Sequence, residues 1–97
     1  MRPRRVRFAA AFGRSYQKFP AEMQQMIDTA VQAFIQRSRE HALRRERKAG
    51  LRDIWTFRVD LGVRVFYTQE QDIEGRISEL FHVGKHDDYR IITRRRR

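Results

Sequence analysis

Hydrophobic residues at the start of the chain recur first at alternate positions and then at helical spacing. Val6 and Phe8 alternate with arginines, which predicts a short first strand. Aromatic residues then recur at intervals of four and three, at Phe12, Tyr16 and Phe19. Residues 10–18 are therefore expected to form a helix.

The second helix has the clearest pattern of the chain. One continuous apolar stripe at helical period contains Met23, Met26, Ile27, Ala30, Val31 and Phe34. Pro20 is expected to end the first helix and to open the second at its first position, where a missing N–H costs nothing. Two helices joined this tightly should form an antiparallel hairpin. The arginine-rich residues 37–50 are interpreted as a fraying helix end and a loop, although the stripe could continue through Ala42 and Leu43.

From Ile54 onward the apolar residues alternate, which predicts three strands. The expected core-facing residues are Trp55, Phe57 and Val59 in the first, Val63, Val65 and Tyr67 in the second, and Ile77, Phe81 and Val83 in the third, which runs over 76–85. The order β-α-α-β-β-β predicts an α+β fold, with a helical hairpin on one face of a small antiparallel sheet and the other face open and basic. We expect one domain over residues 1–93 and a disordered basic tail over 94–97.

The loop between the first two of these strands sets their register. A three-residue loop, Asp60-Leu61-Gly62, with Gly62 in the left-handed conformation, would form a type I turn with a bulge. Val59 then pairs with Val63, and the large apolar residues of both strands share one face. A slip of one residue would invert every side chain, so burial selects this register.

This register places Arg58 directly opposite Arg64 on the open face, with His82 and His86 at the same parity. Paired like charges destabilise a sheet unless an anion relieves them. A cationic pair beside an imidazole suits phosphodiester cleavage, which needs charge stabilisation and a proton carrier near pH 7. The alternative is two solvated arginines and a hydrogen-bonded sheet histidine. A zinc site is disfavoured, because strand residues four apart are separated by ~13 Å.

Charge and composition narrow the classes of partner. The 97 residues include 22 Lys and Arg against 12 Asp and Glu, for a formal charge of +10. This charge favours nucleic acid first and an acidic protein second. Cysteine is absent, which suits a reducing cytoplasm. No apolar run approaches the ~18 residues that a membrane helix needs, and no signal peptide is apparent.

Two segments resemble the RelE/ParE toxin superfamily. The first is Asp53-Ile-Trp-Thr-Phe-Arg-Val-Asp-Leu-Gly-Val-Arg-Val-Phe, and the second is Leu80-Phe-His-Val-Gly-Lys-His-Asp-Asp-Tyr-Arg90. The resemblance covers residues 5 to 92. It implies a prokaryotic cytoplasmic toxin, monomeric when free, without a cofactor and neutralised by a cognate antitoxin. RelE-like members enter the ribosomal A site and cut mRNA without a metal, by attack of a 2′-hydroxyl on the adjacent phosphate.

The resemblance also assigns roles to residues. Arg64 matches the arginine that stabilises the transition state, and Arg58 matches a phosphate contact. His86 stands where nuclease members carry the general acid, and Tyr89 approximates the tyrosine that stacks on the nucleotide. No residue clearly matches a general base, for which Lys85, Asp87 and His82 are candidates. The expected RNA-binding residues are Arg44, Arg45, Arg47, Lys48, Lys85 and His82.

Two other readings stay open. ParE-like members inhibit DNA gyrase without enzymatic activity, and a degenerate member would only bind RNA or its antitoxin. Neither needs Arg58, Arg64 and His86 on one face. We therefore favour the ribosome-dependent endoribonuclease, with mRNA, the ribosome and an antitoxin as partners.

Overall fold

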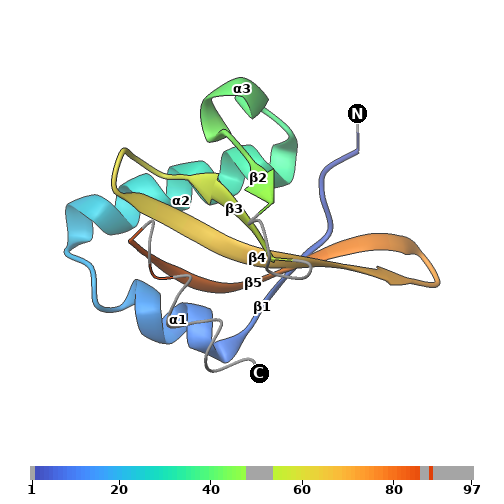
Figure 1. Ribbon diagram of the computed structural model, residues 1–97, viewed down its shortest axis with the longest axis horizontal. Helices are drawn as coiled ribbons and strands as arrows, with labels where there is room; N and C mark the ends of the chain where they lie inside the picture. Colours follow the sequence, from blue (N-terminus) through green and yellow to red (C-terminus); the bar gives the residue numbers. More distant parts are fainter. Residues whose placement is uncertain (1, 48–53, 86–87, 89–97) are drawn as a thin grey trace.

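The computed structural model describes residues 2–47, 54–85 and 88. The order of elements is β1 (Val6–Phe8), α1 (Ala10–Tyr16), α2 (Ala21–Gln36), α3 (Glu40–Leu43), β2 (Glu46–Arg47), β3 (Ile54–Arg58), β4 (Val63–Asp72) and β5 (Gly75–Lys85) (Figure 1). The expected helix-then-strand order is confirmed. Two short elements, α3 and β2, lie in the region that was expected to be a fraying helix end and a loop.

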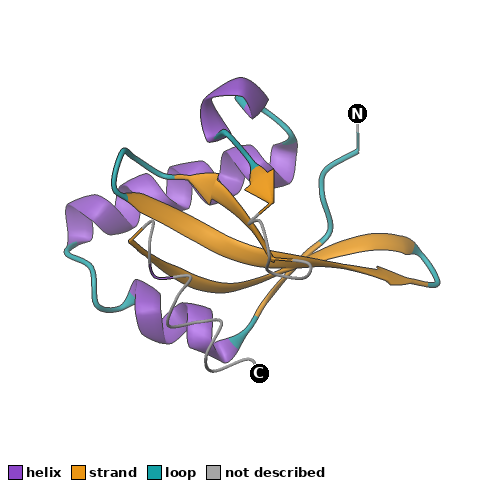
Figure 2. Ribbon diagram, in the orientation of Figure 1, coloured by secondary structure: helices purple, strands orange, loops and turns teal. Residues whose placement is uncertain are grey.

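The strands form one sheet in the order β1-β5-β4-β3-β2 (Figure 2). The expectation of a purely antiparallel sheet is wrong at one edge, because β1 pairs with β5 in parallel. β1 is too short to pair with the whole edge of β5, and α1 lies against that edge beyond the end of β1. The Ser15 hydroxyl accepts a hydrogen bond of 3.0 Å from the Val83 N–H, so α1 satisfies a backbone donor at the exposed edge of β5.

The main core lies between α2 and one face of the sheet. Phe34 is fully buried and stacks on Phe57, with ring centroids 4.5 Å apart, and also contacts the ring of Tyr67. The predicted stripe of α2 supplies most of this core, but Met26 is 43% exposed. The helix begins one residue later than expected, since Pro20 is its N-cap, and it ends at Arg37 in the left-handed conformation.

The register between β3 and β4 is the predicted one, but the turn is built differently. Phe57 pairs with Val65 and Arg58 with Arg64. Gly62 does not have the positive φ that was expected. Instead the Asp60 carboxylate accepts hydrogen bonds of 2.8 Å from the N–H groups of Gly62 and Val63. An Asx-type turn therefore holds the register in place of a left-handed glycine.

A bulge between Phe66 and Tyr67 changes the parity of β5. Leu80 joins the core beneath α2, whereas Phe81, which was expected there, packs with Ile54 and Phe66 on the opposite face. Because β5 has one extra residue at the bulge, its side chains before that point lie on the opposite face of the sheet from the one expected. The second face of the sheet thus carries a small apolar cluster and is less open than predicted.

Beyond the bulge, β4 and β5 continue as a hairpin that projects from the body of the molecule (Figure 1). Two arginines of the N-terminal strand region bind acidic side chains on this hairpin. Arg5 pairs with Asp72 at 2.7 Å, and Arg7 pairs with Glu79 at 3.1 Å. In the described part of the chain, no helix is long and apolar enough to cross a membrane.

Candidate functional site

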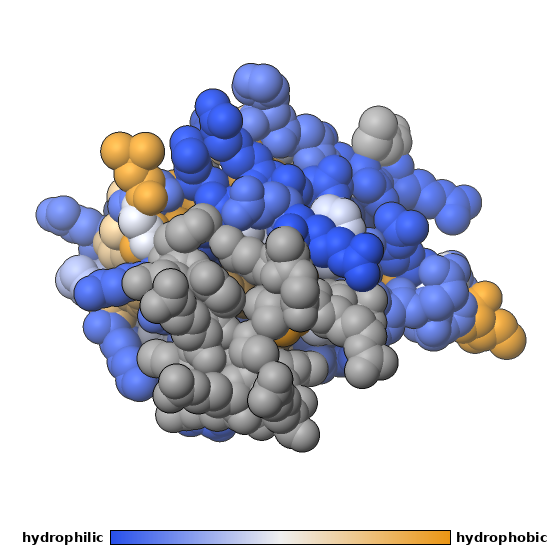
Figure 3. All heavy atoms as spheres, viewed as in Figure 1, coloured by the Kyte–Doolittle hydropathy of each residue, from blue (hydrophilic) through white to orange (hydrophobic). Residues whose placement is uncertain are grey.

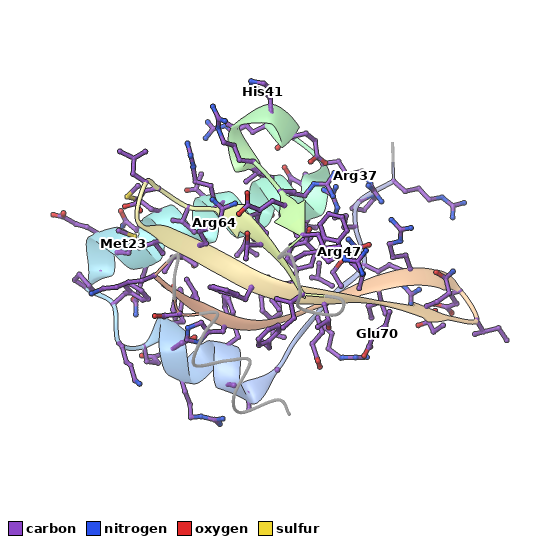
Figure 4. The ribbon with its side chains drawn as sticks, viewed as in Figure 1. Met23, Arg37, His41, Arg47, Arg64 and Glu70 are labelled. Atoms are coloured by element: carbon purple, nitrogen blue, oxygen red, sulfur yellow. The ribbon has the colours of Figure 1, made fainter. Side chains whose placement is uncertain are left out.

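Arg64 is held by two neutral oxygen atoms on the second face of the sheet (Figure 4). Its Nε donates a hydrogen bond of 2.9 Å to the Thr56 hydroxyl, and its NH2 donates one of 2.7 Å to the Arg44 carbonyl. The residue is only 5% exposed. Burial lowers the pKa of Arg64, the Glu46 carboxylate raises it, and the charge of Arg58 lowers it further. The guanidinium is therefore fixed in direction while much of its charge stays uncompensated.

Arg58 lies directly across the strand pair from Arg64, as the register predicted. Its Nε is buried and has no hydrogen-bond partner in the structure as described. The side chain also lines a groove of about 430 Å³ between α2, α3 and the β3–β4 turn, together with Met26 and Leu43. An unpartnered guanidinium nitrogen beside a second guanidinium forms a region that favours an anion.

An imidazole and a carboxylate complete this region. His82 pairs with Phe66, and Gly84 pairs with Arg64, so both belong to the face that carries the two arginines. The Nε2 of His82 lies 3.0 Å from Asp88 Oδ2, which also accepts a hydrogen bond of 3.1 Å from the Lys85 N–H. Diagonal neighbours on adjacent strands are roughly 7–8 Å apart, a span that one phosphate group bridges between long side chains.

Gly84 makes room for this contact. A Cβ atom at Gly84 would lie 2.6 Å from His82 Nε2 and would also collide with Asp88 Oδ2. The absence of a side chain therefore lets the carboxylate settle over the strand beside the imidazole. Asp88 was not among the predicted site residues, so this partner of His82 was missed. A glycine at the same parity as Arg64 and His82 was the signal that could have indicated it.

The other predicted site residues are placed as follows. His86, Tyr89 and Lys48 lie outside the described residues. Exposed positions are occupied by Arg44, Arg45, Arg47 and Lys85. Arg45 forms an ion pair of 3.1 Å with Glu40, so part of its charge is already used within the protein. His82 is half-buried and engaged with Asp88, and RNA binding by this set stays a prediction.

Among the residues that Figure 3 colours, most of the surface is hydrophilic and the hydrophobic groups form small areas. Leu61 in the β3–β4 turn and Ile73 at the end of the β4–β5 hairpin are the most exposed large apolar residues among those described. In the part of the chain that can be described, no group of three or more His, Asp or Glu side chains is arranged to hold a metal ion.

The fold is shared with several solved structures. The chain matches the toxin–antitoxin complex RelBE2 from Mycobacterium tuberculosis with a TM-score of 0.63 and 19% identity, over 87% of this chain and 99% of the other. It matches a mutant of toxin RelE from E. coli with a TM-score of 0.60 and 14% identity, over 94% and 92% of the two chains. The chain has the RelE/ParE toxin fold.

The match to the YoeB/ParE toxin from Agrobacterium tumefaciens agrees, with a TM-score of 0.58 and 17% identity over 84% of this chain and 98% of that toxin. No family model matches the sequence, and no curated protein is similar to it in sequence. The resemblance of the two sequence segments and the likeness in structure both indicate the RelE/ParE fold.

Proposed function

We propose that this chain is the toxin of a toxin–antitoxin pair and that it cleaves mRNA in the ribosomal A site. One observation carries the proposal. Arg58 and Arg64 are paired across β3 and β4, and Arg64 is fixed by the Thr56 hydroxyl and the Arg44 carbonyl. Donors that are fixed before the substrate arrives stabilise a transition state without the cost of reorganising them.

The proposed reaction is attack of a ribose 2′-hydroxyl on its own 3′-phosphate. A base takes the proton of the 2′-hydroxyl, the new P–O bond forms, and the bond to the 5′-oxygen breaks as that oxygen receives a proton. The products are a 2′,3′-cyclic phosphate and a 5′-hydroxyl. Arg64 and Arg58 balance the charge that accumulates on the phosphate, and no metal takes part.

The resemblance supplies the remaining roles in the proposal. His86 would protonate the leaving oxygen, and Tyr89 would stack on or orient the nucleotide. His82 lies on the sheet face that carries the two arginines, and its contact with Asp88 suits a base whose ring is held in one orientation. The exposed basic residues near α3 and β5 would bind RNA backbone. A cognate antitoxin would bind the toxin in the prokaryotic cytoplasm, and RelE proteins of similar structure from Pyrococcus horikoshii and Methanococcus jannaschii form complexes with RelB.

The test compares two double variants, each of which replaces one arginine and one histidine with alanine. Arg64→Ala with His86→Ala removes both predicted catalytic groups, whereas Arg14→Ala with His41→Ala removes one arginine and one histidine from exposed positions on α1 and α3. Each protein is expressed from an inducible promoter, cleavage sites in cellular transcripts are mapped, and plasmid supercoiling is measured in the same cells.

The proposal expects codon-spaced cleavage by the wild type and the control variant, and none by the Arg64/His86 variant. Equal cleavage by both double variants would show that the site is assigned wrongly. Growth inhibition accompanied by altered supercoiling, without transcript cleavage, would favour the gyrase-inhibiting alternative. Circular dichroism of both variants would verify that the fold is intact.

A further inference from the structure

A second basic cavity lies beyond the C-terminal end of α2. It has a volume of about 100 Å³ and opens between the N-terminal segment, the end of α2 and the β4–β5 hairpin. Its lining includes five arginines, which are Arg4, Arg5, Arg37, Arg45 and Arg76. The polar side chains of Gln69 and Ser78, which pair across β4 and β5, complete it. We call this cavity the arginine pocket.

Three of the five guanidinium groups already have acidic partners. Arg4 and Arg45 share the carboxylate of Glu40, at 2.7 Å and 3.1 Å. Arg5 is paired with Asp72 at 2.7 Å and lies 3.5 Å from Glu74. The pairs of Arg4 with Glu40 and of Arg5 with Asp72 join segments that are distant in the sequence, and they therefore help to fix the walls of the pocket.

The other two arginines contribute charge that the protein does not neutralise. Arg37 Nε donates a hydrogen bond of 2.9 Å to the Arg2 carbonyl, which is a neutral acceptor. Arg76 is exposed, and neither residue forms an ion pair with a carboxylate of the described chain. A concave surface concentrates the field of such charges, so the pocket attracts an anion.

The size of the pocket limits what can enter. A cavity of about 100 Å³ has space for one phosphate group, and its lining of guanidinium, amide and hydroxyl groups suits that group better than an apolar base. Arginine side chains suit this ligand, because their planar forks donate two parallel hydrogen bonds to phosphate oxygens. The expected ligand is therefore a phosphate, recognised without regard to base sequence.

The pocket and the candidate site belong to different faces of the sheet. Along β4, Arg64 and Gln69 are five residues apart, which is roughly 17 Å, and they have opposite parity. Figure 4 shows Arg64 and Arg37 in separate parts of the molecule. A nucleotide in the candidate site cannot also fill the pocket, so its phosphate must come from another part of the RNA.

We infer that the arginine pocket binds a backbone phosphate of structured RNA and thereby docks the toxin, separately from the scissile nucleotide. The inference rests on the proposed RNA-directed function only for the choice of RNA as the polyanion. Binding at the pocket does not require cleavage, so the two proposals can fail independently.

The test measures RNA binding as a function of salt for matched variants of the full chain. Arg37→Gln with Arg76→Gln removes the two uncompensated charges and leaves the ion pairs of the walls in place. Arg14→Gln with Lys18→Gln removes the same charge from exposed positions on and just after α1. The probe is a fluorescent 20-base-pair RNA hairpin, titrated at several NaCl concentrations, with thermal melting recorded for each protein.

The inference expects the pocket variant to bind about tenfold more weakly at low salt and to lose about one unit of slope in log K against log salt, the value for one phosphate contact. The control should keep the wild-type slope. Equal slopes for the two double variants would overturn the inference. If the pocket variant melts early, the single variant Arg76→Gln takes its place, and an unchanged slope together with wild-type affinity would then overturn the inference.

The cleavage assay separates this outcome from the proposed function. A variant altered at Arg58 should lose cleavage and keep the salt dependence of hairpin binding. Loss of cleavage with unchanged salt dependence would support the inference, because it separates binding of the hairpin from the catalytic site. Binding of the hairpin at wild-type strength by the pocket variant would refute the inference whether or not the chain cleaves RNA.

Discussion

Arginine side chains are held in two different ways at the two ends of the sheet. On the projecting β4–β5 hairpin, Arg5 and Arg7 are bound by carboxylates, and both are partly or largely exposed. Beside the β3–β4 turn, Arg64 is nearly buried and is held by a hydroxyl and a carbonyl, with Arg58 opposite. Carboxylate partners neutralise a guanidinium, whereas neutral oxygens orient it and leave its charge for a ligand.

This difference separates structural arginines from candidate functional ones better than exposure does. A buried charge without full compensation is costly, and it persists where the fold holds it in place. Arg64 meets this description even though Glu46 offsets part of the field there, and the Nε of Arg58 is likewise buried without a hydrogen-bond partner in the described structure. Substitutions that remove either kind of arginine, or its partners, test the distinction directly.

The largest effect is expected for the arginine that is held by neutral oxygens. Arg64→Gln should reduce cleavage of ribosome-bound mRNA by about 10²–10³-fold, the range for loss of one transition-state donor. Arg7→Gln on the hairpin should change the rate less than about threefold, because its charge is already neutralised by Glu79 and Glu70. Single-turnover cleavage on programmed ribosomes measures both rates, and similar losses in the two variants would remove the distinction.

The next effect concerns the hydroxyl that orients Arg64. Thr56→Val should lower the free energy of unfolding by about 1–3 kcal/mol, since it leaves a buried guanidinium N–H without its acceptor. Thr68→Val is the matched control on the same face, because the buried Thr68 hydroxyl has no hydrogen-bond partner in the described structure. It should be neutral or stabilising. Urea denaturation of the wild type and the two variants measures these free energies. Equal destabilisation by Thr56→Val and Thr68→Val would mean that the Thr56–Arg64 contact contributes nothing.

A smaller effect is expected where a missing side chain shapes the site. Gly84→Ala should displace the Asp88 carboxylate from His82 and Lys85 and cost about 1 kcal/mol, with faster hydrogen exchange of the Lys85 amide. Gly13→Ala in α1 meets no atom within 4 Å and should stabilise the protein by about 0.5–1 kcal/mol. Unchanged exchange at Lys85 in the Gly84 variant would show that Asp88 does not depend on this gap.

Much of the region around Arg58 and Arg64 could be predicted from the sequence, because burial alone selects the pairing of β3 with β4. The alternation of large apolar residues leaves one register that hides them all. The prediction gave the right register with the wrong turn, since Asp60 performs locally what was expected of Gly62. Several turn chemistries suit one loop length, whereas only one register suits the apolar pattern.

Features that depend on contacts between residues distant in the sequence could not be predicted from the sequence. The bulge that places Leu80 in the core and Phe81 on the opposite face has no clear pattern in the sequence, because both residues are apolar and suit either face. The anchor of Arg64 on the Arg44 carbonyl depends on the left-handed backbone at Arg44, which ends α3. Both are set by packing after the chain has folded, which sequence periodicity does not record.

The smallest effect belongs to the hairpin, where the partners of the arginines titrate. The Arg5 guanidinium, hydrogen-bonded to Asp72, holds the pKa of that carboxyl at about 2 against burial, which raises it, and the Glu74 N–H lowers it further. A pKa below the unfolded value of about 3.9 stabilises the fold above that value, and the contribution is lost as the pH falls toward 2. The difference in urea midpoint between the wild type and Asp72→Asn should therefore be constant from pH 7 to 5 and shrink between pH 4 and 2.

The difference caused by Thr56→Val should not change over this range, because neither the Thr56 hydroxyl nor the guanidinium of Arg64 titrates there. A difference for Asp72→Asn that stayed unchanged at pH 2 would mean that this ion pair does not stabilise the hairpin, and the contrast between the two ends of the sheet would then rest on Arg58 and Arg64 alone.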